Sequence, residues 1–152
     1  VLGTGSAGLG ILMAAFGVGA LIGSTFLASV RDLKSAGKLL ILSVIAWHAT
    51  MLVFAASHSF YASLSILLLT GMAFSSTQVM MLTVILRTVL PEFRGRIMGL
   101  RSMAIYSFTF GSMNSGAIAS TWSAPVAANV NAAIGIGLVG LLSLFTPKLR
   151  RA

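Results

Sequence analysis

Few side chains in this sequence could do chemistry, and the acidic ones lie in two short polar stretches. Asp32 and Glu92 are the only carboxylates, and the chain has no cysteine. Glu92 stands four residues before Arg96, the favourable order for an ion pair on one helical face. Pro91 suits a first helical position, where a missing N–H costs nothing. The stretch 91–96 is therefore interpreted as a short helix or tight turn at a membrane surface; the alternative is a solvated loop between two helices.

The two histidines differ in their surroundings. His48 lies near the middle of an apolar run, whereas His58 follows in the next turn. An ionisable residue inside a membrane is a functional candidate by default. Trp47 beside His48 and the lack of a nearby carboxylate favour a polar anchor bonded to a neighbouring helix over a titrating group. Neither H-E-x-x-H nor G-x-S-x-G occurs, so the sequence predicts no enzyme, no metal site and no cofactor.

A glycine-rich stretch near the start, Gly3 to Gly8, spells G-x-G-x-x-G. In dinucleotide-binding proteins this pattern follows a strand and opens a helix of a soluble βαβ unit. Here no strand precedes it, and the helix that follows is too apolar for such a unit. The stretch is interpreted as a flexible loop before a helix.

The composition places the chain in a membrane. Hydrophobic residues make up 57% of the 152 residues and charged residues only 8%, against roughly 25% charged in soluble domains. The formal net charge of +8 could suggest a nucleic-acid partner. The basic residues form three tight groups between apolar runs instead of one face, which argues against nucleic acid. The predicted surroundings are a lipid bilayer.

Five apolar runs are each about long enough to cross roughly 30 Å of hydrocarbon. They cover residues 8–30, 39–57, 62–86, 102–122 and 126–145. The sequence therefore predicts an all-α, polytopic membrane helix bundle with five transmembrane helices, and residues 1–152 form one partial bundle.

The basic residues follow only alternate runs, the first, third and fifth. They are Arg31, Lys34 and Lys38; Arg87, Arg94, Arg96 and Arg101; and Lys148, Arg150 and Arg151. Because basic loops stay in the cytoplasm, this pattern predicts an integral membrane protein with its N-terminus outside and its C-terminus in the cytoplasm.

Small and polar residues within the runs indicate helix contacts or a polar path. Small residues at helical spacing predict close packing: Ala15, Gly19, Gly23, Gly111, Ser112 and Gly116. Gly71, Ser75 and Gln78 share one helical face, which is either hydrogen-bonding glue between helices or the wall of a polar cavity. Asn114 either packs against a helix or faces a solvated path.

The loop with Pro91-Glu92 and Arg94-Gly95-Arg96, followed by an apolar helix with Gly111-Ser112 and Gly116, resembles the major facilitator superfamily. The likeness is to the C-terminal half of the branch that includes the enterobactin exporter and related drug exporters. In that branch such a loop joins the tenth and eleventh helices. Residues 14–23 resemble its eighth helix and residues 147–150 the end of its twelfth, although Thr109 stands where many relatives carry Pro.

The resemblance implies roles for these residues. A cavity-lining tenth helix would put Gly71, Ser75 and Gln78 on the substrate path, and Asn114 is a further candidate. The eighth and eleventh helices would pack between the two halves, whereas a peripheral ninth helix would keep His48 away from substrate. Loop residues would latch the cytoplasmic side in one of the alternating states: Arg31, Asp32, Glu92, Arg94, Gly95 and Arg96.

The resulting hypothesis is a fragment of a secondary transporter that exports an unknown small molecule, siderophore-like or drug-like, by alternating access. Its missing partners would be the N-terminal half and the seventh helix of the same protein, in a bacterial plasma (inner) membrane. The chain starts at Val1, without an initiator Met or signal peptide, which agrees with a fragment. The alternative is a non-transporting or truncated membrane protein that binds partners through Gly/Ala-rich helices. Upstream sequence encoding further spanning helices would separate the two.

Overall fold

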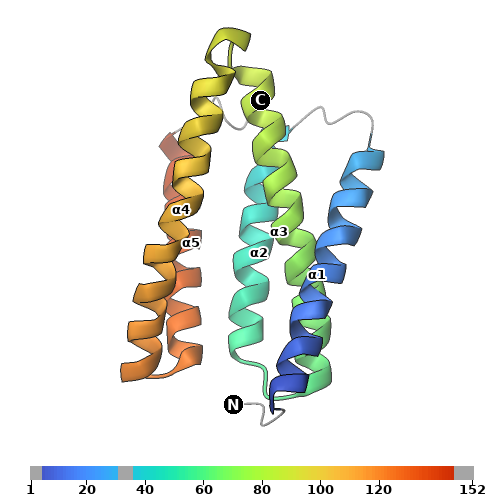
Figure 1. Cartoon of the computed structure of the whole chain (residues 1–152), viewed down its shortest axis with the longest axis vertical. Coiled ribbons are helices and arrows are strands. Elements are labelled where there is room, and N and C mark those ends of the chain that lie inside the picture. Colours follow the sequence, from blue (N-terminus) through green and yellow to red (C-terminus); the bar gives the residue numbers. More distant parts are fainter. Residues whose placement is uncertain (1–4, 31–35, 146–152) are drawn as a thin grey trace.

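The computed structural model describes residues 5–30 and 36–145, and the regular structure of this part is entirely helical. The five helices are α1 (Gly5–Ser29), α2 (Ala36–Ala55), α3 (Phe60–Thr88), α4 (Pro91–Thr121) and α5 (Ala124–Phe145). All five run roughly along the long axis of the molecule (Figure 1). The predicted all-α bundle is confirmed.

Four of the five helices are long and apolar enough to cross a membrane. These are α1, α2, α3 and the segment Ala124–Leu141 of α5. Helix α4 has the length but not the hydropathy, because its centre holds Ser112, Asn114 and Ser115 and its first half carries Arg94, Arg96 and Arg101. Many large apolar side chains point outward, among them Leu21, Phe26, Phe110 and Met113. This is the surface expected where the surroundings are lipid.

The charged segment between the third and fourth runs is much more helical than the sequence indicated. Helix α3 continues to Thr88, and α4 begins at Pro91, so only residues 89 and 90 separate them. Pro91 occupies the start of α4, and Glu92 lies in its first turn, where a negative charge favours the helix dipole. Charged side chains beyond the hydrocarbon carry no burial cost, so nothing prevents the helix from extending through them. We call this α3–α4 junction, residues 86–96, the elbow.

The closest helix contact joins α1 and α3 through glycines on both helices. A Cβ added at Gly19 would lie 2.0 Å from the carbonyl oxygen of Leu68, and one at Gly71 would lie 2.1 Å from that of Phe16. Gly23 meets the carbonyl of Met72 in the same way, at 2.6 Å. Only residues without a side chain allow backbones to approach this closely.

Helix α3 also packs on α2, and this contact is partly polar. The Thr77 and Ser43 hydroxyl oxygens lie within hydrogen-bond distance of each other (3.2 Å), while the Trp47 and Phe74 rings meet edge to face at 5.2 Å. Toward the elbow, Met80 and Val84 form a small buried core with Ala36. Helix α3, which has partners on two sides, is therefore the most buried helix of the described chain.

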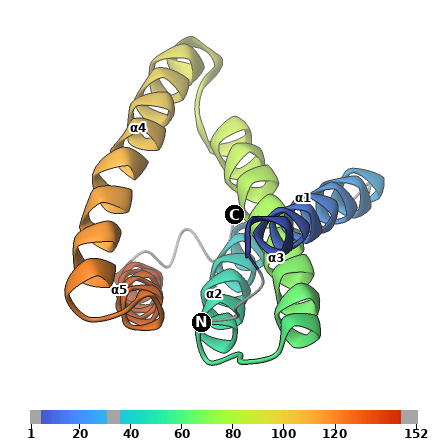
Figure 2. The ribbon, with the colours of Figure 1, turned by 60° about the horizontal axis from the view of Figure 1, so that its bottom comes forward.

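The helices form an open arc rather than a closed bundle. Within the described residues α1 contacts α3, α3 contacts α2, α2 contacts α5, and α5 contacts α4. Helix α4 meets α3 only weakly, and Figure 2 shows the two helices diverging from the elbow. Helices α1 and α4 are therefore the ends of the arc, and each has a face without a helical partner in the described structure.

Candidate functional site

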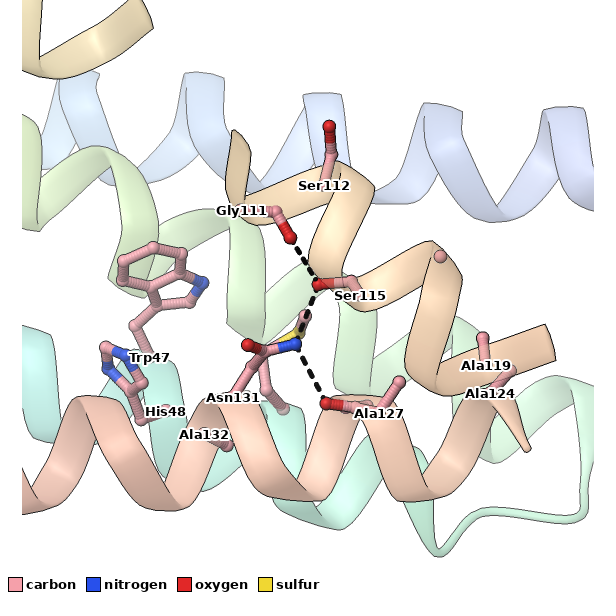
Figure 3. A pocket seen from close by; sticks show the side chains of 13 residues that line it. Trp47, His48, Gly111, Ser112, Ser115, Ala119, Ala124, Ala127, Asn131 and Ala132 are labelled. Atoms are coloured by element: carbon pink, nitrogen blue, oxygen red, sulfur yellow. Dashed lines mark hydrogen bonds between the residues drawn. The ribbon is translucent and has the colours of Figure 1, made fainter. Parts of the chain in front are cut away.

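A pocket of about 630 Å³ opens between α2, α4 and α5. Figure 3 shows the residues around it. Its walls are mostly alanine and glycine; the larger or polar lining residues are Trp47, His48 and Met51 of α2, Ser112 and Ser115 of α4, and Asn131 of α5. The small residues leave the space, and the few polar groups lie on its sides.

One hydrogen-bonded chain ties α5 to α4 at this pocket. The Asn131 amide nitrogen donates to the Ser115 hydroxyl (2.8 Å) and to the Ala127 carbonyl (2.9 Å). Ser115 in turn donates to the Gly111 carbonyl (2.8 Å), and Figure 3 shows these bonds in one line across the site. In a membrane such interhelical hydrogen bonds are worth on average about 0.6 kcal/mol. The Asn131–Ser115 bond therefore fixes the position of α4 relative to α5 but adds little to the stability of the fold.

The His48 side chain packs between α2 and α5 in this structure. Its Nδ1 bonds to the Val44 carbonyl of its own helix at 2.8 Å, whereas the polar-anchor hypothesis expected a bond to a neighbouring helix. The ring lies directly against Gly135 of α5, where an added Cβ would be 1.9 Å from Nε2. Gly135 thus leaves room for the imidazole between α2 and α5.

The face of α3 predicted to line a cavity is covered by α1 over part of its length. Gly71 lies against the Phe16 carbonyl, and Ser75 lies beside Gly23 and donates to the Met72 carbonyl. In this conformation these two residues face a helix rather than an open path. Gln78, one turn nearer the elbow, is half-buried and its amide makes no hydrogen bond within the described residues.

The residues predicted to pack helices fall into two groups. Gly19 and Gly23 lie in the α1–α3 contact, and Ala15 on the same helix is half-buried. Gly111, Ser112 and Gly116 instead line the pocket, and a Cβ at either glycine would meet nothing within 4 Å. Asn114 on α4 is exposed. In the described structure, α4 therefore presents small and polar residues that no helix covers.

The predicted latch residues that the structure describes gather at the elbow. Arg94 donates to the Leu86 carbonyl through Nη2 (2.8 Å) and to the Val89 carbonyl through Nε (3.4 Å). Arg96 lies over the Phe93 ring, 5.8 Å from its centroid, and no Glu92–Arg96 ion pair is present in this part of the chain. Gly95 has open space around it, whereas Arg31 and Asp32 lie outside the described residues.

All described Lys, Arg, Asp and Glu residues belong to segments at the elbow end of the arc. They are Lys38, Arg87, Glu92, Arg94, Arg96 and Arg101. The turns between α2 and α3 and between α4 and α5 lie at the opposite end (Figure 1). In the part of the chain that the structure describes, no group of three or more His, Cys, Asp or Glu residues could hold a metal ion.

Sequence reasoning missed three polar contacts between helices. Asn131 ties α5 to α4, Thr77 reaches Ser43 across the α2–α3 contact, and Arg94 bonds backward to the preceding helix. A signal existed for the first, since an Asn inside an apolar helix needs a partner. The other two depend on which helices become neighbours, which a single sequence does not specify.

Comparison with known proteins agrees with this geometry. The family model described as "transmembrane secretion effector", a group of major facilitator type, matches residues 1–151. No curated protein and no solved structure matches the chain significantly. The match covers nearly all of the chain, and the four candidate spans agree with it. The chain therefore belongs to the transmembrane secretion effector family, whose members are membrane transporters of the major facilitator type.

Proposed function

We propose that this chain is part of a secondary transporter that exports a small molecule by alternating access. The observation that carries the proposal is the family match over residues 1–151. The open arc supports it, because alternating access requires one bundle of helices to move against another around a site near the membrane midplane. Drug-like or siderophore-like molecules are the substrate class that the sequence resemblance suggests.

The uncovered faces of α1 and α4 are where we place the remaining helices of the transporter. On α4, Gly111 and Gly116 leave space on the side of the pocket. A further helix with small residues would fit there, because small residues on both sides let backbones come close. The N-terminal half and the seventh helix of the same protein are the proposed partners.

Gln78 and Asn114 are the proposed polar groups of the substrate path. Gln78 is half-buried on α3 and has no hydrogen-bond partner among the described residues, whereas Asn114 is exposed on α4. An amide facing lipid is costly, so both are better accounted for by a polar cavity. In contrast, Ser76 donates to the Met72 carbonyl of its own helix and has no need of a further partner.

We expect Gln78→Leu to impair export, in the complete reading frame, more strongly than His48→Leu at equal membrane abundance. A loss of about tenfold in transport rate corresponds to a single hydrogen bond of about 1.4 kcal/mol. Ser76→Ala is the matched control, because that hydroxyl already bonds to its own helix. Efflux of a fluorescent substrate from cells measures the rates. If His48→Leu abolished export while Gln78→Leu left it intact, the path would be misassigned.

We also propose that the protein lies in a bacterial plasma membrane with the elbow in the cytoplasm. All described charged residues are at the elbow end, and basic segments stay on the cytoplasmic side. Single cysteines at Gly95, Ser59 and Ser123 test this in intact cells with a membrane-impermeant thiol reagent. We expect labelling at Ser59 and Ser123 but not at Gly95 until the cells are opened. Labelling of a cysteine at Gly95 in intact cells would show that the elbow lies outside the cell, the opposite of the proposed topology.

A further inference from the structure

Arg94 makes an unusual connection between consecutive helices. It lies in the first turns of α4, yet its guanidinium donates to carbonyls in and just after the last turn of α3, at Leu86 and Val89. The Leu86 carbonyl needs such a donor, because the chain leaves the helix at Val89, which adopts an extended conformation. The last four carbonyls of a helix have no partner within it. Arg94 supplies one from the next helix.

The position of Arg94 is electrostatically unfavourable for its own helix and favourable for the preceding one. A positive charge near the N-terminus of α4 opposes the dipole of that helix, whereas a positive charge at the C-terminus of α3 stabilises it. Glu92 in the first turn of α4 has the complementary role. The charge of Arg94 is thus placed to serve the junction between the two helices.

We propose that Arg94 fixes the elbow by capping α3, so that the ends of α3 and α4 move as one rigid piece, and that it is not a latch. The guanidinium fork can hold two carbonyl oxygens at once because its donors are planar and fixed in direction. Arg96, two residues later, is exposed; its guanidinium lies over the Phe93 ring and makes no hydrogen bond or ion pair among the described residues. The two arginines of the Arg-Gly-Arg motif therefore have separate roles. The side chains of Arg96 and Glu92 remain available to contact other parts of the protein.

Hydrogen exchange tests this in the complete 152-residue chain in lipid nanodiscs. The amides of Val89 and Phe93, which bond to Ile85 and Leu90, report whether the elbow is closed. We expect Arg94→Ala to speed exchange of segment 86–93 about tenfold, since a bond from a charged donor is lost. Arg94→Lys is expected to restore part of the protection, because an ammonium can reach one carbonyl but lacks the fork.

Arg96→Ala is the matched control, and it should change exchange in the segment much less than Arg94→Ala does. Segment 56–60, at the other end of α3, should be unaffected in every variant. If Arg94→Ala cannot be purified, Arg94→Gln, which keeps a donor without the charge, replaces it in the same comparison. Exchange unchanged by substitution of Arg94 would overturn the proposal, as would an equal effect of Arg96→Ala or full restoration by lysine.

That the ends of α3 and α4 move as one rigid piece during transport rests on the proposed function. The hydrogen-exchange experiment does not depend on that function. Spin labels at Leu86 and Leu100, both exposed, measure whether the two helix ends keep a fixed separation. We expect a single narrow distance distribution in the wild type and Arg96→Ala, and a broad one in Arg94→Ala. If Arg94 caps α3 in these experiments but the full reading frame exports nothing, the transporter hypothesis fails while the capping proposal stands.

Discussion

Gly19→Ala is expected to lower the free energy of unfolding by about 3 kcal/mol, the upper end of the usual cost of overpacking. The added methyl group would be 2.0 Å from the Leu68 carbonyl oxygen and 2.8 Å from the carbonyl carbon. These are backbone atoms, which cannot turn away as a side chain could, so α1 and α3 would have to separate. Their separation would also weaken the neighbouring contacts at Gly23 and Gly71.

Gly17→Ala is the matched control, two residues earlier on the same helix. A Cβ there would meet nothing within 4 Å, and alanine is the better helix former by about 1 kcal/mol. We therefore expect opposite signs for two chemically identical substitutions. Detergent-induced unfolding followed by Trp47 fluorescence, in a Trp122→Phe background, measures both. Equal tolerance of alanine at the two positions would mean that α1 and α3 are not in this contact.

Gly71→Ala offers an independent check on the same contact from the other helix. Its added Cβ would lie 2.1 Å from the Phe16 carbonyl oxygen. Because Gly19 and Gly71 belong to one contact, the double variant should lose less stability than the sum of the two single losses, since the helices separate only once.

The sequence predicted the helices because apolar length is a local property. Runs of about twenty apolar residues have few alternatives to a membrane helix, and small residues at i, i+4 indicated where α1 packs closely. Gly19 and Gly23 do lie at a helix contact. The partner could not be read from the sequence, because Gly71, which completes the contact, was equally compatible with a cavity wall.

The polar residues were harder to assign for the same reason. Ser75, Ser76 and Thr77 cluster in the sequence, but each donates to a carbonyl of its own helix, so their clustering alone does not indicate a cavity. Gln78 differs, because its longer amide side chain has no hydrogen bond within the described structure. Burial and bonding, rather than residue type, thus separate a candidate path residue from hydroxyl groups that are satisfied locally.

The charged segment shows how one local signal can mislead. Pro91 correctly indicated a helix start, but the density of charge suggested that the helix would be short. Charge limits the hydrocarbon-spanning part of a helix and not the helix itself, since outside the membrane the side chains are solvated. Helix α4 therefore extends through Arg94, Arg96 and Arg101 without interruption.

We expect the 152-residue chain alone to insert into liposomes but to catalyse no saturable flux. Helices α1 and α4 end an open arc, and alternating access needs a second bundle that moves against the first. The test uses a fluorescent dye that the complete reading frame is first shown to export. The purified chain and protein-free liposomes are then compared across a range of dye concentrations.

We expect no flux because, in the described structure, no helix forms the opposite wall of the proposed substrate path. In the described structure Asn114 is exposed and the Gln78 amide lacks a hydrogen bond, so neither has the closed polar surroundings that substrate binding requires. A rate equal to that of protein-free liposomes is the predicted result. Saturable flux that Gln78→Leu removes and Ser76→Ala leaves intact would contradict it, because the chain would then have to form a functional oligomer whose copies supply the missing wall to one another.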